Sequence, residues 1–152
     1  MLLVAAPGLP SLLDFDPPRT GDLRKIELQV HEIVNRERIS RHIPELNWSE
    51  ALAGEARRHA ARIANGRFFS HQDPVRGDID IRLNKSGIEW IRCGENLYEG
   101  DSGNLARDAV KTWLESSGHR KNMLDSKFSE TGVGIAVRKD KTIVVVQEYI
   151  YR

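Results

Sequence analysis

Apolar residues recur at three- and four-residue spacing in three long stretches of the chain. The first covers residues 23–39, the second begins after Ser49 and ends before Gly66, and the third runs from near Ser102 to Ser116. This spacing places the apolar side chains on one face of a helix. Ser49 favours the position before a helix, and Gly66 favours the position after one. The pattern therefore predicts three amphipathic helices, each with one buried face.

Shorter elements lie between and after these helices. Residues 78–86 suit a short helix closed by Gly87, residues 88–98 suit an extended segment, and residues 119–124 suit a turn of helix. The pattern then changes from helix-like to strand-like. Residues 132–137 and 142–146 are rich in β-branched side chains, which favour strands.

These two runs predict a hairpin joined by Lys139-Asp140-Lys141. Helices come first and strands late, without a strand-helix-strand alternation. The order predicts an α+β domain in which helices cover a small antiparallel sheet.

The start of the chain differs from the rest. Residues 1–20 hold four of the six prolines and open with a short apolar run, 1–6, that lacks the basic start and the length of a signal peptide. We expect an extended arm at 1–20 and one domain at 21–152, since 152 residues is near the usual size of a single domain. No apolar run approaches the roughly 20 residues that a membrane span needs.

Charge excludes two kinds of partner. Lys and Arg number 23 against 22 for Asp and Glu, so the net charge is +1. A chain with this charge balance lacks the excess of basic residues that is typical of proteins that bind nucleic acid or an anionic membrane surface. The single cysteine, Cys93, cannot form an internal disulfide, and we interpret it as a packing residue rather than a nucleophile.

Three short polar motifs lie at element boundaries: Phe68-Phe69-Ser70-His71, Gly94-Glu95-Asn96-Leu97, and Ser117-Gly118-His119-Arg120-Lys121-Asn122-Met123-Leu124. Together with Trp113 and the strand at Val133-Gly134-Ile135, their order and spacing resemble the CAP superfamily, which comprises cysteine-rich secretory proteins, antigen five and pathogenesis-related proteins. The resemblance covers about residues 23–151 and is strongest to the compact prokaryotic members.

The resemblance implies an α-β-α sandwich with a cleft lined by two histidines and acidic residues. His71 and His119 match the two histidines, and Glu95 matches the glutamate of the Gly-Glu-Asn motif. Glu115 is the nearest candidate for a second cleft glutamate. Neutral imidazoles and a carboxylate suit Zn²⁺ or another divalent metal, and three protein ligands leave one position open.

Three functions remain open on this basis. The first is a secreted or cell-surface binding module, not a conventional enzyme, whose cleft holds a divalent metal and a lipid, sterol or extended peptide ligand. The second is a metal-dependent hydrolase with Glu95 or Glu115 as base, although the chain lacks an H-E-x-x-H motif. The third is a structural or interaction domain whose polar residues only hold loops together.

Other polar residues have structural interpretations. His59 lies on an apolar helix face and should be a packed histidine bonded to backbone, whereas His31 and His42 should be surface residues. Asn96 and Asn122 should satisfy backbone groups in loops.

The remaining polar and aromatic residues are interpreted as packing residues rather than catalytic ones. Ser70 next to His71 is no serine nucleophile, because a G-x-S-x-G turn is missing. Trp48 and Trp90 should pack at the edge of the core, and Trp113 should lie within it.

Overall fold

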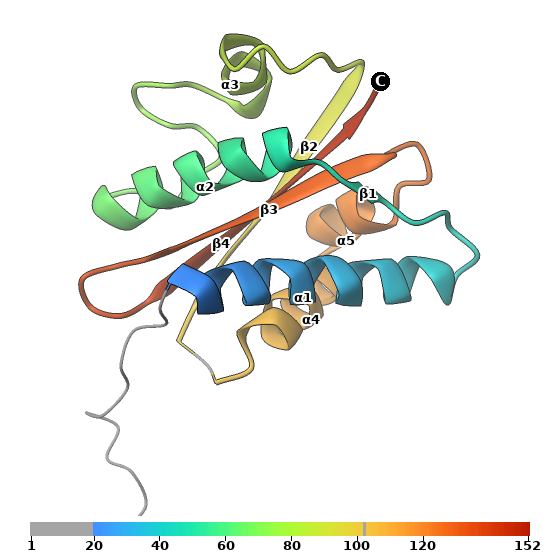
Figure 1. Cartoon of the computed structure of the whole chain (residues 1–152), viewed down its shortest axis with the longest axis horizontal. Coiled ribbons are helices and arrows are strands. Elements are labelled where there is room, and N and C mark those ends of the chain that lie inside the picture. The colour runs from blue at the N-terminus through green and yellow to red at the C-terminus, as the bar shows by residue number, and fades with distance from the viewer. Residues whose placement is uncertain (1–19, 102) are drawn as a thin grey trace, which may run out of the picture.

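The computed structural model of the chain describes residues 20–101 and 103–152 (Figure 1). The helices are α1 (Thr20–Ile39), α2 (Glu50–Asn65), α3 (Ile79–Lys85), α4 (Leu105–Glu115) and α5 (Ser117–Leu124). The strands are β1 (Asn47–Trp48), β2 (Arg92–Gly100), β3 (Glu130–Val137) and β4 (Ile143–Tyr151). The predicted arm lies outside the described residues, except for Thr20, which begins α1.

The start of α2 and the end of α3 follow the predicted signals. The Ser49 side chain accepts a hydrogen bond from the Leu52 amide (3.3 Å) at the start of α2, as an N-cap should. Gly87 has a φ of +69°, the left-handed conformation expected after α3. Two starts were predicted wrongly: α4 begins at Leu105, and α5 begins at Ser117 rather than at 119. Ser102 itself lies outside the described residues.

The strands form one sheet in the order β1-β3-β4-β2. β3 pairs with β4 and β4 pairs with β2 in antiparallel fashion, but β1 pairs with β3 in parallel. The predicted antiparallel sheet is therefore a mixed sheet. The sequence did not reveal β1 because two residues are too few to show an alternating pattern.

Helices cover both faces of this sheet. Val144 and Val146 of β4 pack in one apolar cluster with α2, whereas Val145 and Tyr149 pack in another with α1, α4 and α5. This alternation is what a strand buried on both faces requires. Figure 1 shows α2 and α3 on one side of the strands and α1 and α4 on the other. The predicted α-β-α sandwich is confirmed.

Two glycines allow α2 to lie unusually close to β3. A Cβ on Gly132 would lie 2.1 Å from the backbone nitrogen of Ala53, and one on Gly134 would lie 2.1 Å from that of Arg57. Real Cβ atoms do not approach backbone this closely. The Gly132-Val133-Gly134 run of β3 is therefore a packing requirement, which holds α2 at a fixed height over the sheet.

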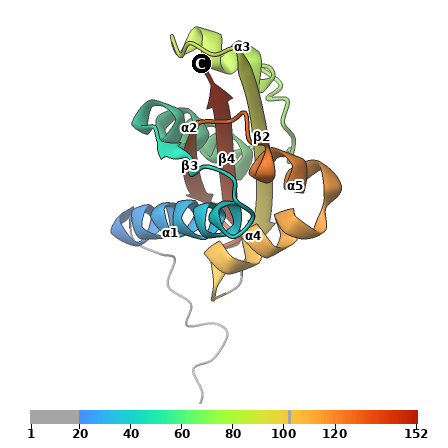
Figure 2. The same ribbon diagram turned by 90° about the vertical axis from the view of Figure 1, so that its right-hand side faces the viewer.

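The core centres on Trp113, which is fully buried in the cluster beneath α1 and α4. Its indole nitrogen donates to the Leu97 carbonyl of β2 (2.9 Å), so the predicted core position is confirmed and also tethers α4 to the sheet. At the other end of the sheet, Leu83 of α3 packs with Ile150 of β4. Figure 2 shows the chain terminus beside α3 at that end.

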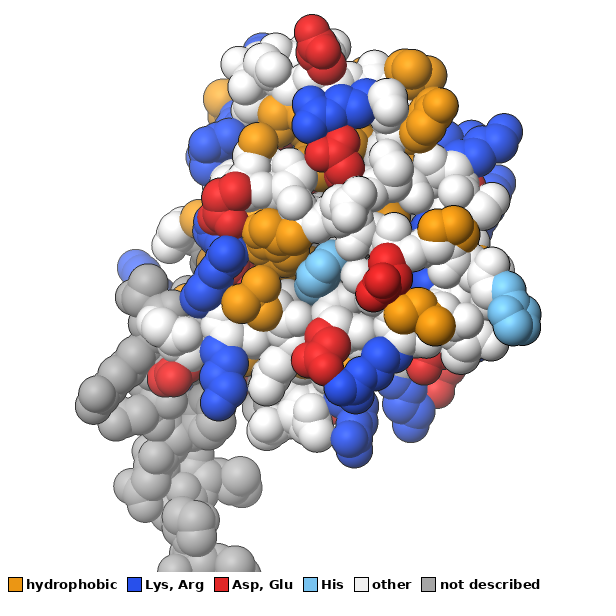
Figure 3. All heavy atoms as spheres, turned by 45° about the vertical axis from the view of Figure 1, so that its right-hand side comes forward, with side chains coloured by type: hydrophobic (Ala, Val, Ile, Leu, Met, Phe, Trp, Pro, Cys, Tyr) orange, Lys and Arg blue, Asp and Glu red, His pale blue; other side chains and the backbone are white. Residues whose placement is uncertain are grey.

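The surface and the helices carry two further observations. Basic and acidic side chains are intermixed on the face shown in Figure 3, without a continuous field of one sign. Among the helices in the described ranges, none combines the length and the apolar character that crossing a membrane requires.

Candidate functional site at the edge of the sheet

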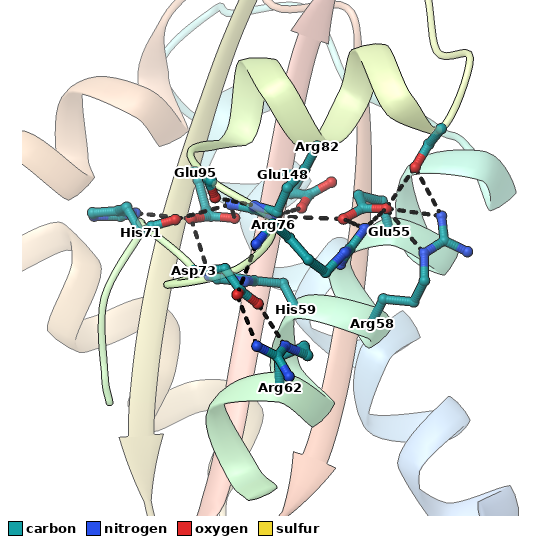
Figure 4. Close-up of polar contacts among 12 residues, drawn as sticks. Glu55, Arg58, His59, Arg62, His71, Asp73, Arg76, Arg82, Glu95 and Glu148 are labelled. Atoms are coloured by element: carbon teal, nitrogen blue, oxygen red, sulfur yellow. Dashed lines mark hydrogen bonds and ion pairs between the residues drawn. The ribbon is translucent and has the colours of Figure 1, made fainter. Parts of the chain in front are cut away.

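The three sequence motifs meet at β2, the edge strand of the sheet. His71 comes from the segment between α2 and α3, Glu95 from β2, and His119 from α5. His71 Nδ1 and Glu95 Oε1 lie 2.9 Å apart (Figure 4). Because an ionised carboxylate only accepts hydrogen bonds, His71 Nδ1 carries a proton and donates it to Glu95 Oε1.

Glu95 is a buried carboxylate with both oxygens engaged. Arg82 Nη2 donates to Oε2 (2.7 Å), and His59 Nε2 lies 3.7 Å from Oε1. Burial alone would raise the pKa of Glu95, but the His71 hydrogen bond and the Arg82 charge outweigh it and lower the pKa below its usual range. Glu95 is therefore held as an anion that orients His71.

Arg82 is fully buried and joins several acidic residues under α3 (Figure 4). Its Nη1 donates to Glu148 Oε1 (2.9 Å) and lies 3.8 Å from Glu55 Oε1. The register of β2 and β4 places Glu95 directly opposite Glu148. Two ionised carboxylates in that position would repel each other, and the Arg82 guanidinium that bonds both side chains reduces this cost.

The two facing carboxyl groups titrate in opposite directions. Burial and the charge of Glu95 raise the pKa of Glu148 well above its usual range. Glu148 Oε2 is buried and has no hydrogen-bond partner in the described part of the chain. A protonated Glu148 beside an ionised Glu95 is the arrangement that two buried carboxyl groups sharing one cation favour.

The other side of β2 is held by asparagines. Asn96 Nδ2 donates to the His119 carbonyl (3.0 Å), and Asn122 Nδ2 donates to the Glu95 carbonyl (3.1 Å) and to Asn96 Oδ1 (3.0 Å). These bonds agree with the structural role predicted for both asparagines. They fix α5, and with it His119, against the edge strand.

The His119 ring is half-buried and has an unused nitrogen. Its Nδ1 is buried and has no hydrogen-bond partner among the described residues. Burial first, and the nearby charge of His71 second, lower the pKa of His119, so the neutral ring is favoured. The neutral His119 ring therefore offers a nitrogen lone pair.

Glu115 is not brought into this group. It ends α4 with an exposed side chain, and its described ion pair is with Lys111, at 4.0 Å. Within the described residues, no three His, Cys, Asp or Glu side chains are arranged as a ready metal cluster. Both carboxylate oxygens of Glu95 are already engaged, by His71 and by Arg82.

The remaining histidines are structural. His59 is buried and its Nε2 donates to the Ser70 carbonyl (3.0 Å), which confirms the predicted packed histidine; its closeness to Glu95 was not foreseen. His42 is exposed as predicted. His31 is not a surface residue but half-buried, edge-on to Trp48 at 5.3 Å between ring centroids. Trp90 is half-buried, and its indole nitrogen donates to the Asn84 side chain (3.0 Å).

Cys93 should react slowly with thiol reagents. It is half-buried, and burial, assisted by the charge of Asp80, raises its pKa to about 11. Since only the thiolate reacts, its alkylation by iodoacetamide at pH 7.5 should be about a hundredfold slower than that of a free cysteine. Mass spectrometry over time would measure the rate. Urea-unfolded protein serves as the control, and equal rates in the two states would contradict the prediction.

The family can be identified from this fold and site. The chain combines an α-β-α sandwich with two histidines and a glutamate around the edge strand of its sheet. The model of the cysteine-rich secretory protein family, CAP, matches residues 31–149, and the chain belongs to that family. The resemblance inferred from the motifs is confirmed.

The chain is similar to several bacterial proteins. It is 33% identical over 108 residues to YkwD of Bacillus subtilis, an overlap of 71% of this chain and 41% of YkwD. An extracellular protein of Bacillus anthracis with an SCP domain superposes with a TM-score of 0.76 at 28% identity, covering 91% of this chain and 45% of that chain.

A more distant likeness shows the fold alone. An outer surface protein of Borrelia burgdorferi superposes with a TM-score of 0.78 at 17% identity, covering 86% of this chain and 96% of that chain. The present chain spans less than half the length of YkwD and of the B. anthracis protein.

Proposed function

We propose that the chain is an extracellular or cell-surface binding module whose site at β2 holds a divalent metal ion. The observation that carries this proposal is the pair of imidazoles: His119 has a buried Nδ1 without a partner among the described residues, and Glu95 fixes the proton of His71 on Nδ1. The B. anthracis protein, which is described as extracellular, supports this location.

Each residue has a distinct part in the proposed site. His71 and His119 would hold the ion, because neutral imidazole is a good ligand for zinc and similar metals. Glu95 would support His71 from behind, an arrangement that raises the basicity of a ligating histidine. A bound metal would supply a Lewis-acidic centre with positions open to water or a ligand.

The geometry favours binding over hydrolysis. A hydrolase would need a carboxylate free to accept a proton, yet Glu95 is hydrogen-bonded by both His71 and Arg82. Glu115 lies away on the exposed face of α4 and pairs with Lys111. The lipid, sterol or peptide ligand implied by the resemblance stays a prediction.

Zinc titration of the metal-stripped protein by calorimetry tests the proposal. We expect one saturable site, with an affinity that falls at least tenfold in His71→Ala and in His119→Ala, because each variant removes one of the two imidazole ligands. His42→Ala is the matched control, since it removes an exposed imidazole that belongs to none of the three motifs. Circular dichroism would confirm folding.

Two outcomes would contradict the proposal. The unaltered protein could fail to bind zinc, or all three alanine variants could bind it equally well. Either result would leave His71, Glu95 and Asn96 as a hydrogen-bond network that only stabilises the fold.

A further inference from the structure

A hollow lies outside the His71 site, on the outer side of α2. It has a volume of about 490 Å³ and is bounded by α2 and by the segment that follows it. Three of the residues that line it are arginines, Arg58, Arg62 and Arg76, and its apolar wall includes Phe68 and Pro74. None of the proposed metal-site residues lines it.

The three guanidinium groups are held in place by carboxylates. Arg62 pairs side-on with Asp73 through Nε (2.8 Å) and Nη2 (2.9 Å), and Arg58 uses Nε (3.0 Å) and Nη2 (2.8 Å) on Glu55. Arg76 Nη2 also donates to Glu55 (3.0 Å). Figure 4 shows these pairs side by side. Anchoring of this kind removes most of the conformational freedom that a ligand would otherwise have to freeze.

Each of these arginines has N–H donors that its carboxylate partner does not use. The bonds of Arg58 and Arg62 to their carboxylates use Nε and Nη2, which leaves Nη1 of each to other partners. Nη1 of Arg76 is buried and has no hydrogen-bond partner among the described residues. A buried N–H without an acceptor costs free energy, and an acceptor placed in the hollow would recover it.

The charges around the hollow do not cancel. Arg58, Arg62 and Arg76 carry three positive charges, against two negative charges on Glu55 and Asp73. This leaves an excess of one positive charge, which a monoanion would neutralise. Phe68 and Pro74 beside it would contact the apolar part of such a ligand.

We propose that this hollow, the arginine pocket, binds a small organic monocarboxylate through Arg58, Arg62 and Arg76, with the apolar body of the ligand on Phe68 and Pro74. A planar carboxylate matches the planar donors of a guanidinium group, and a single negative charge matches the excess. This site is separate from the proposed metal site and does not depend on it.

Titration of the ¹⁵N-labelled protein with 4-phenylbutyrate, followed by NMR, tests the proposal. Saturable shifts should centre on residues 58–68 and 74–76, whereas the neutral amide of the same acid should bind at least tenfold more weakly because it lacks the charge. Acetate and inorganic phosphate are further arms, and both should bind more weakly than 4-phenylbutyrate, because neither carries an apolar body.

Two variants make the assignment specific. Arg76→Gln and Arg58→Gln should each weaken 4-phenylbutyrate binding about tenfold by removing a charged donor. Arg36→Gln, which removes an exposed arginine of α1 paired with Glu32, should leave it unchanged. Arg58 is more exposed than Arg76, so its loss tests the pocket even if Arg76→Gln folds poorly.

The result that overturns the proposal is equally clear. The proposal fails if 4-phenylbutyrate gives no saturable shifts or if the amide binds as tightly as the acid. It also fails if the folded Arg58 and Arg76 variants bind 4-phenylbutyrate as tightly as Arg36→Gln does. The zinc titration is independent of these outcomes, because the pocket shares no residue with the His71 and His119 pair.

Discussion

Replacing Arg82 with methionine should lower the free energy of unfolding by about 3–5 kcal/mol, the cost of breaking a buried ion pair and leaving its partners unpaired. Arg82 is fully buried and contacts Glu95, Glu148 and Glu55. Methionine fills much of the volume but supplies no charge, so the carboxyl groups that remain must repel one another or take up protons.

Urea and thermal denaturation would measure this loss, with an expected fall in Tm of roughly 10 °C. Arg36→Met is the control, because its exposed pair with Glu32 should contribute less than about 1 kcal/mol. Adding Glu148→Gln to Arg82→Met should restore part of the stability, since it removes one of the facing acids. An Arg82→Met protein as stable as the Arg36→Met control would show that the network contributes nothing to folding.

Gly134→Ala should destabilise the protein by about 3 kcal/mol or more, the upper range for an overpacked core. The added Cβ would lie 2.1 Å from the backbone nitrogen of Arg57, so α2 must move away from β3. Such a shift would separate the apolar residues of α2 from Val144 and Val146.

The matched control is Gly54→Ala, which adds the same methyl group to α2 itself. A Cβ on Gly54 meets nothing within 4 Å, and alanine in place of glycine should stabilise a helix by up to about 1 kcal/mol. The two substitutions should therefore change the urea midpoint in opposite directions. A Gly134→Ala protein with an unchanged midpoint would refute the close packing of α2 on β3.

Local patterns in the sequence predicted most of the fold. The Ser49 cap and the stop at Gly66 bounded α2 correctly, and the β-branched tail marked the β3–β4 hairpin. These features succeed because each depends on neighbours a few residues away. β1 was missed because its two residues form a strand only when β3 lies beside them.

The site was predictable only in part. The motifs pointed to His71, Glu95 and His119, and the structure places His71 against Glu95. Nothing local indicated Arg82, whose partner Glu148 lies 66 residues away in the chain. One signal was present: Glu148 is an acidic residue within a run of apolar strand residues, where a charge must find a partner.

The two side chains that bond to the outer carbonyls of β2 also bear on self-association. Asn122 occupies the Glu95 carbonyl and Trp113 the Leu97 carbonyl, so a strand from a second molecule would have to displace both donors before it could pair there. At the opposite edge, β1 offers only two residues. The Glu95 and Leu97 carbonyls are thus unavailable to an added strand, which makes edge-to-edge association through β2 less favourable.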